Sequence, residues 1–155
     1  MTGPTIVPDI ASIKDHVDKP LGTTDWVTLP QEQINAFAEA TGDTQWIHVD
    51  VERAARESPF GRTIAHGYLT LALAPRLLSQ LLQVENASRI VNYGIDKMRL
   101  PAAVPAGARV RLSAEIKGVR DLRSGGARVV IALELEVEGS RKPALTARAV
   151  YVYFP

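Results

Sequence analysis

Residues 64–84, IAHGYLTLALAPRLLSQLLQV, form the most apolar segment of this chain, and Arg76 is their only formal charge. A helix without a polar face is normally buried. A run of this length can also span a bilayer, but Pro75, Gln80 and Gln83 interrupt it and polar strands follow it. We therefore expect a core helix and no membrane span. Pro75 should kink this helix, because proline lacks a backbone donor and clashes with the preceding turn.

Two later segments alternate apolar and polar residues with a period of two: residues 108–117, ARVRLSAEIK, and residues 129–138, VVIALELEVE. This period is typical of strands with one buried face. The sequence RSGG at residues 123–126 predicts a hairpin turn between them. We expect further strands at about residues 90–100 and 145–154. The pattern predicts an α+β fold, in which one antiparallel sheet covers the apolar helix.

The chain has 155 residues, which suits a single domain spanning residues 1–155 with a sizeable core. Residues 1–20 contain three prolines among mixed polar residues, so we expect an N-terminal arm or irregular lead-in there. Residues 22–29, GTTDWVTL, are typical of a short strand.

A helix should begin at Pro30, because proline is favourable at the first helical position. Gly42 is a natural C-terminal cap for this helix. We expect a loop at residues 43–49. Asp50 can then cap a second short helix over residues 51–57.

The composition excludes several classes of function. A net charge of +1 gives no electrostatic footprint for nucleic acid. The chain contains no cysteine, which excludes disulfides, a zinc–thiolate site and a cysteine nucleophile. The N-terminus has no signal-peptide pattern. We therefore expect a cytoplasmic protein without a nucleic-acid or membrane partner.

Asp43 and His48 can form an acid/base pair if the chain turns between them. On a continuous helix, five residues would place their side chains about 140° apart. If Gly42 ends the helix, both side chains can face one cleft, where the imidazole accepts a proton and the carboxylate holds a water. Spacing alone leaves a second reading open, in which Asp43 binds local backbone and His48 is a half-buried spacer.

Two motifs resemble the signature of the MaoC-like, (R)-specific enoyl-CoA hydratases in order and spacing. The matching residues are Phe37, Thr41-Gly42-Asp43, Ile47-His48 and Ala54, followed by Ile64-Ala65-His66-Gly67. The chain departs from the family pattern at Gln45, which replaces asparagine, and at Trp46, which replaces proline. The resemblance implies a hot-dog fold, in which an antiparallel sheet wraps a long central helix, usually in a dimer. An open sheet edge also favours pairing, and we expect a homodimer.

The resemblance implies that Asp43 and His48 are the catalytic residues. It also implies that the backbone N–H of Gly67 binds the thioester oxygen, because a helix N-terminus has unpaired donors and glycine allows close approach. The alternative is that Gly67 only permits tight packing. No metal or redox cofactor is expected, since the net change is one water.

Three further residues are candidates for contact with an acyl-CoA substrate. His66 either touches the substrate or acts as a capping or packing residue. Lys97 and Arg99 either meet the phosphates of coenzyme A or form an exposed strand face. Small residues such as Ala72 and Ala74 can leave room for an acyl tunnel beside the helix.

The sequence thus predicts a hydro-lyase that adds water reversibly to trans-2-enoyl-CoA and gives (3R)-3-hydroxyacyl-CoA. One alternative is a dehydratase, or a dehydratase subunit, that acts on acyl carrier protein thioesters in fatty-acid elongation. A second is a hot-dog protein that binds acyl thioesters without turnover, and a thioesterase is a weaker option.

Overall fold

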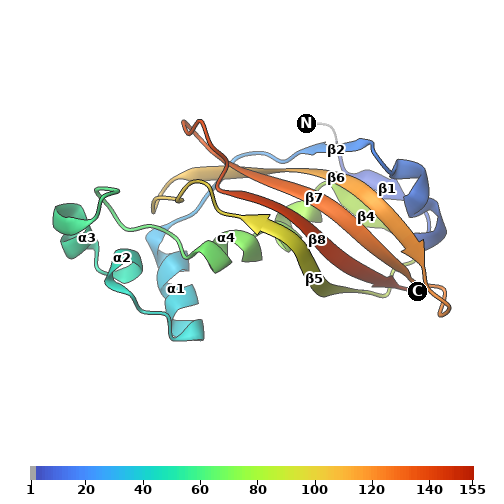
Figure 1. Cartoon of the computed structure of the whole chain (residues 1–155), viewed down its shortest axis with the longest axis horizontal. Helices are drawn as coiled ribbons and strands as arrows, with labels where there is room; N and C mark the ends of the chain where they lie inside the picture. The colour runs from blue at the N-terminus through green and yellow to red at the C-terminus, as the bar shows by residue number, and fades with distance from the viewer. Residues whose placement is uncertain (1–2) are drawn as a thin grey trace.

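The computed structural model describes residues 3–155, so the first two residues of the expected N-terminal arm lie outside the described part. One antiparallel sheet forms the body of the molecule, and a broken helix lies against it (Figure 1). The long strands follow the order β6-β7-β8-β5, and β2 and β3 pair with β6. Their bounds are β2 (Pro20–Thr23), β3 (Val27–Thr28), β5 (Arg89–Arg99), β6 (Arg109–Asp121), β7 (Ala127–Val137) and β8 (Leu145–Phe154). This is the expected hot-dog arrangement of the α+β class.

The period-two pattern sets which face of the sheet is buried. In β6, Val110, Leu112 and Ile116 are fully buried and Ala114 is buried with them, whereas the alternate residues Arg111, Ser113 and Glu115 remain partly exposed. In β7, Ile131 lies opposite Ile116 and is also fully buried. Both predicted strands and the hairpin between them are therefore confirmed.

The central helix is shorter than predicted. Helix α4 (Gly67–Ala72) and α5 (Ala74–Leu78) replace one helix over residues 64–84, and the chain then forms β4 (Leu82–Val84). The helix breaks just before Pro75, which has no N–H for the preceding turn. Leu82 and Val84 are apolar because β4 packs with the core. Periodicity alone does not separate a short buried strand from a buried helix.

The composition predicted a helix that is buried on all sides, but one side of it is exposed. Tyr68 is 71% exposed, and Ala72, Pro75 and Arg76 are exposed with it on one side. The opposite side, with Leu69, Leu73 and Leu77 among others, packs in the core. One face of this apolar helix is therefore open to solvent in the single chain.

The N-terminal segment is ordered, so the expectation of an irregular lead-in was wrong. Strand β1 (Thr5–Val7) pairs in parallel with β4, and the 3₁₀ helix η1 (Ile10–His16) follows it. Val7, Ile10 and Ile13 enter the core. Strand β1 lies in a stretch without a recognisable strand period, so neither β1 nor its partner β4 was predicted.

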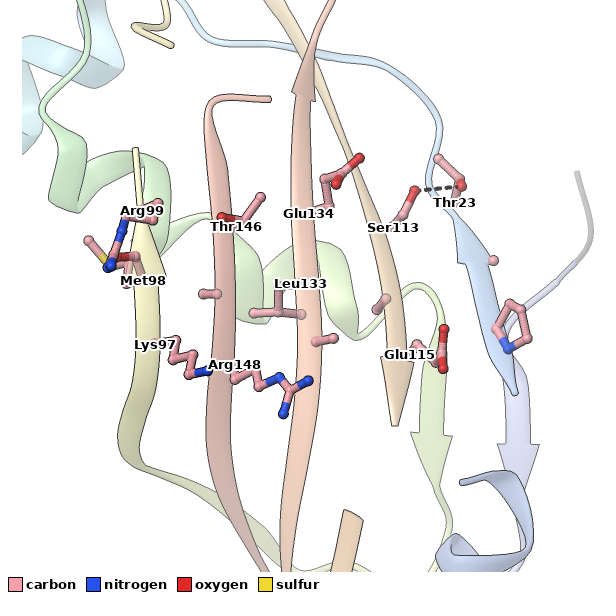
Figure 2. Close-up of a pocket in the computed structure, with 15 residues that line it drawn as sticks. Thr23, Lys97, Met98, Arg99, Ser113, Glu115, Leu133, Glu134, Thr146 and Arg148 are labelled. Atoms are coloured by element: carbon pink, nitrogen blue, oxygen red, sulfur yellow. Dashed lines mark hydrogen bonds between the residues drawn. The ribbon is translucent and has the colours of Figure 1, made fainter. Parts of the chain in front are cut away.

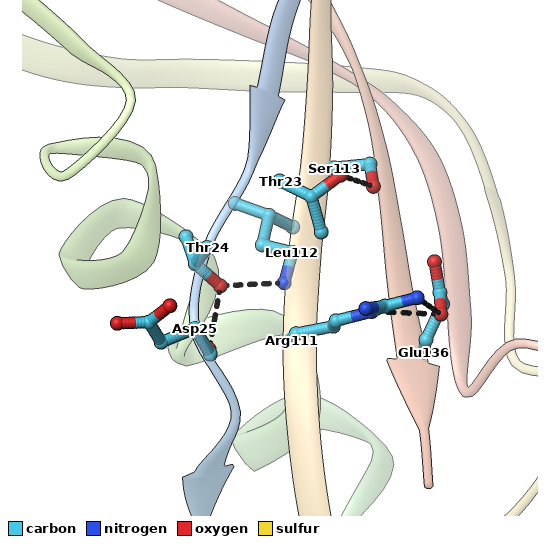
Figure 3. Close-up of polar contacts among 7 residues, drawn as sticks. All are labelled: Thr23, Thr24, Asp25, Arg111, Leu112, Ser113 and Glu136. Carbon is cyan, nitrogen blue, oxygen red and sulfur yellow. Dashed lines mark hydrogen bonds and ion pairs between the residues drawn. The ribbon is translucent and has the colours of Figure 1, made fainter. Parts of the chain in front are cut away.

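The strand predicted at residues 22–29 is divided into β2 and β3 by Thr24. The Thr24 N–H donates to the Leu112 carbonyl, and its hydroxyl oxygen accepts the Leu112 N–H at 3.0 Å (Figure 3). The same hydroxyl donates to the Asp25 carbonyl. A side chain thus takes over the pairing where the strand is interrupted.

Three short helices gather beyond one end of the sheet, close to the start of α4 (Figure 1). They are α1 (Gln31–Thr41), α2 (Trp46–Val49) and α3 (Val51–Glu57). Asp50 caps α3 as predicted, because its carboxylate accepts the Arg53 N–H at 2.9 Å. In residues 3–155, no helix combines the length and apolar character that crossing a membrane requires.

Candidate functional site

Gly42 ends α1 and redirects the chain toward the site. Its φ of 78° lies in the left-handed region, and its N–H donates to the Ala38 carbonyl at 2.8 Å. Glycine adopts this conformation without strain. The turn predicted between Asp43 and His48 is therefore present, but residues 46–49 form the single helical turn α2 where a loop was expected.

His48 is buried, and a hydrogen bond fixes which of its nitrogens can act as a base. Its Nδ1 lies 2.7 Å from the carbonyl oxygen of Ile64. A carbonyl oxygen only accepts, so Nδ1 carries the proton and Nε2 keeps its lone pair. The Ile64 carbonyl thus sets the tautomer of His48, and His48 can accept a proton at Nε2.

His66 joins the separate parts of the site. Its ring is 2% exposed and stacks on the His48 ring, with centroids 3.9 Å apart and an interplanar angle of 24°. Phe37 approaches the His66 ring at 4.8 Å. His66 Nε2 donates to the backbone carbonyl of Asp43 at 2.9 Å. One imidazole therefore contacts both residues of the predicted pair.

Asp43, His48 and His66 each offer a polar side-chain atom, and these atoms lie within 4.8 Å of one another. The two histidines are buried, whereas Asp43 still reaches solvent. The structure thus brings the predicted acid and base together. This proximity is what an acid/base pair requires, and the catalytic roles of Asp43 and His48 stay predictions.

Three such groups are also a conceivable metal-ligand set, but their geometry does not suit one. Imidazole lone pairs lie in the ring plane, so two stacked rings direct them in nearly parallel planes. Turning the rings toward a shared ion would break the bonds to the Ile64 and Asp43 carbonyls.

Gly67 follows His66 directly and is the first residue of α4. The first N–H groups of a helix have no acceptor within it. A side chain at Gly67 would also collide with Leu100, since a Cβ atom would lie 2.5 Å from Leu100 Cδ1. The packing role and the role as a backbone donor are therefore compatible at this position.

The structure does not place Lys97 and Arg99 with the acid/base pair. They line a hollow of about 730 Å³ on the outer face of the sheet, together with Arg148 (Figure 2). Ala147 and Ala149 are buried on the helix side, so Arg148 between them points to the opposite face. Lys97 lies directly across from Arg148 in the register of β5 and β8.

A second groove, of about 350 Å³, runs along the exposed side of the central helix. It begins at Tyr68, next to Gly67, and passes Ala72 and Pro75. Its other wall comes from residues 92–95 of β5 and residues 149–151 of β8. Ala72 lines this groove as expected, whereas Ala74 is fully buried and does not.

Two polar residues that the sequence analysis did not single out also contact the site. Gln31 donates a hydrogen bond to the His48 carbonyl, and the Thr63 hydroxyl donates to Gln31. Both belong to common residue types, and they lie 17 and 15 residues from His48 in the chain. No local pattern in the sequence could have revealed these contacts.

Comparison with known proteins identifies the family. Residues 12–138 match the MaoC like domain. The chain is 49% identical to 3-hydroxyacyl-thioester dehydratase Z of Mycobacterium tuberculosis over 144 residues, which covers 93% of this chain and 95% of that protein.

Solved structures agree on the fold. An (R)-hydratase from Pseudomonas aeruginosa superposes with a TM-score of 0.73 at 21% identity, covering 96% of this chain and 88% of that one. A (3R)-hydroxyacyl-ACP dehydratase complex from Mycobacterium tuberculosis gives a TM-score of 0.66 at 18% identity, covering 84% and 94%. The chain belongs to the MaoC-like dehydratase family and is an enzyme of the hydratase and dehydratase class.

Proposed function

We propose that this enzyme adds water reversibly to trans-2-enoyl-CoA and gives (3R)-3-hydroxyacyl-CoA. The observation that carries the proposal is the convergence of Asp43 and His48 beside the start of α4, through the ring of His66. An acid, a base and an unpaired backbone donor therefore lie at one place, as addition of water to an unsaturated thioester requires.

In the proposed reaction, His48 Nε2 takes a proton from a bound water, whose oxygen attacks C3. Asp43 helps hold this water and takes part in delivering a proton to C2, so the product contains one added water. The Nδ1–H bond to Ile64 keeps Nε2 available for the first step. The reaction needs no redox cofactor, because it transfers no electrons, and the proposed steps use no metal.

Negative charge develops on the thioester oxygen as the water adds. The Gly67 N–H stabilises this charge at the start of α4. One preorganised donor of this kind lowers a barrier by about 3–4 kcal/mol.

The groove along α4 and α5 suits an acyl chain. Small or apolar residues such as Ala72 and Pro75 form its helix wall, and Tyr151 contributes to the other wall. Burial raises the pKa of the Tyr151 hydroxyl, so this phenol stays uncharged at neutral pH. Since the groove starts one residue beyond Gly67, an acyl chain in it has its thioester near the helix tip.

The rim of this groove and the adjoining edge of the sheet are the proposed contact with a second copy of the chain. Among the strands of residues 3–155, β5 pairs with β8 alone, and Tyr93 is 67% exposed on it. Exposed strand edges and apolar patches favour association. A second copy would cover Tyr68, Tyr93 and the open helix face, and we propose a homodimer in the cytoplasm.

The main test is an assay of crotonyl-CoA hydration, in which the rate is measured from the loss of enoyl-thioester absorbance. Asp43→Asn and His48→Gln should each lower kcat by at least about 100-fold with folding intact. His16→Gln is the matched control, because His16 lies in η1, away from the site. Wild-type rates in both site variants would refute the assignment.

Four measurements refine the proposal. Rates for enoyl-CoA chains of increasing length, with the chirality of the product, define the substrate. Equivalent thioesters of acyl carrier protein show which carrier the enzyme prefers, and Lys97→Ala and Arg99→Ala show whether those residues affect KM for CoA. Sedimentation at micromolar concentration tests the dimer, and a monomer alone would contradict it.

A further inference from the structure

Gln31, at the start of α1, binds the backbone of the residue that we propose as the base. Its Nε2 donates to the His48 carbonyl oxygen at 2.7 Å and to Asn35 Oδ1 at 2.8 Å. Both partners are acceptors, so the amide NH₂ must face them. This contact crosses from α1 to α2, which follow each other in the chain and are separated by the turn at Gly42.

Thr63 fixes the opposite end of the same amide. The Thr63 hydroxyl donates to Gln31 Oε1, and Thr63 is only 1% exposed. The two ends of Gln31 therefore have complementary partners. A flipped amide would lose the bond to the His48 carbonyl, which only accepts, so Oε1 faces the Thr63 hydroxyl. A buried hydroxyl and a partly buried amide thus have a single mutual arrangement.

These contacts close a cycle around His48. Thr63 is bonded covalently to Ile64, whose carbonyl accepts the Nδ1–H of His48 at 2.7 Å. The Ile64 N–H also donates to the Ile47 carbonyl at 3.0 Å. Backbone and ring of His48 are consequently held from two sides, and Gln31 is the side chain that completes the cycle with Thr63.

Helix α2 needs such external support. It has four residues, and its N-cap residue Gln45 makes no side-chain capping bond. Isolated helices of this length are not stable in water, and their last carbonyls lack partners. Gln31 supplies the partner for one of these carbonyls, the one that belongs to His48.

We infer that Gln31 is a positioning residue for His48, acting together with Thr63 through this hydrogen-bond cycle. The inference rests on the proposed function, in which Nε2 of His48 is the proton acceptor. Gln31 does not touch the substrate. It keeps the His48 backbone at the depth where the ring reaches Ile64, and this contact keeps the proton on Nδ1.

Two pairs of variants test the cycle. Gln31→Leu gives an apolar side chain one atom shorter and removes every side-chain hydrogen bond. Gln31→Glu keeps the length and an acceptor but removes the donors. Thr63→Val removes the hydroxyl with little change of shape, whereas Thr63→Ser retains it. Asn35→Ala is the control, because it removes only the exposed partner of Gln31.

For crotonyl-CoA hydration, both Gln31 variants should lower kcat about 10- to 100-fold while KM changes by less than about twofold, because misplacement of a base affects the chemical step. Thr63→Val should lower kcat several-fold, and Thr63→Ser should restore it. Asn35→Ala should match the wild type.

Nitrogen-15 NMR of the imidazole groups gives a readout that does not depend on turnover. His48→Gln identifies the His48 signals. In the wild type, neutral His48 should show the Nδ1–H tautomer, and Gln31→Leu should give a mixture of both tautomers. A folded Gln31→Leu variant with wild-type kcat and an unchanged tautomer would overturn the inference.

The same experiments separate this inference from the proposed function. If His48→Gln retains full hydration activity, His48 is not the base and the proposed function fails. The tautomer of His48 in the Gln31 and Thr63 variants still decides whether the cycle positions the ring. If Gln31→Leu does not fold, Gln31→Glu and Thr63→Val give the same decision.

Discussion

Strand β6 has thirteen residues and pairs with β7 from Val110 to Asp121, whereas α2, which carries His48, has four residues. The sheet is ordered by many equivalent backbone bonds and a continuous apolar face. The site segment, residues 31–67, depends on a few side-chain bonds made by Gln31, His66 and Thr63. The two regions should therefore respond differently to substitution.

This difference has a physical basis. Loss of one contact in the sheet leaves its neighbours in place, so the cost appears in the global free energy of unfolding. Loss of one bond in the site segment displaces a catalytic group without unfolding the chain. Displacement of about 1 Å can reduce a rate about 100-fold, although a single hydrogen bond contributes only about 1 kcal/mol to stability.

Ile131→Ala should have the largest effect on stability. Ile131 is fully buried in β7, so the substitution removes apolar contacts and leaves a cavity. We expect a loss of about 2–5 kcal/mol in the free energy of unfolding, measured with denaturant. The kcat of the folded enzyme should stay unchanged. A marked fall in kcat would show that the sheet and the site segment are not separable.

His66 variants should show the opposite response. His66→Phe keeps a ring between Phe37 and His48 but cannot donate to the Asp43 carbonyl, whereas His66→Gln keeps a donor without the ring. We expect kcat to fall about 10- to 100-fold in the Phe variant and less in the Gln variant. Stability should change by about 1–2 kcal/mol.

The ranking of the two His66 variants is the informative result. If His66→Gln is the poorer enzyme, stacking on His48 matters more than the bond to Asp43. Equal kcat values at the wild-type level in both would contradict the view that His66 joins the acid and the base.

The strands of the sheet could be predicted because the alternation of apolar and polar residues lies within each strand's own sequence. Strand β8 has the predicted bounds, and β5 lies within one residue of them at each end. The segment 64–84 was misread because Leu82 and Val84 belong to a strand and not to the helix before them. They pair with β1, at a distance of 77 residues along the chain, and no local pattern contains that information.

The site was predictable only in part, for the same reason. Gly42, Asp43 and His48 lie in one short stretch, so their spacing and resemblance to known motifs were sufficient. The contacts of Gln31 and Thr63 join residues 32 positions apart. The position of Lys97 on the outer face followed from strand register, which depends on the bulge between Ile95 and Lys97.

Gly42→Ala should affect both regions of the comparison to a moderate degree. A non-glycine residue at a φ of 78° costs about 1–2 kcal/mol, and relief of this strain would move Asp43. We expect a lower melting temperature together with a lower kcat. Gly118→Ala in β6 is the control, because its φ is not positive and space is open around it. Equal effects of the two substitutions would contradict the role of the left-handed cap.

The smallest effect should come from Glu138, at the end of the sheet. Its carboxylate accepts hydrogen bonds from Arg109, about half of each side chain is exposed, and these bonds hold the pKa of Glu138 below its usual value. A lowered pKa stabilises the fold above the unfolded-state pKa of about 4.3 and ceases to do so as the pH falls through the folded-state value. The melting temperature of Glu138→Gln should therefore lie slightly below that of the wild type at about pH 7, and the two should converge in acid.

Glu85→Gln is the control, because the Glu85 carboxylate forms no ion pair within residues 3–155. This variant should show no such difference at either pH. Neither substitution should change kcat, because an exposed ion pair between long strands orients nothing in the site segment, whereas the buried bonds of Gln31 orient the base itself.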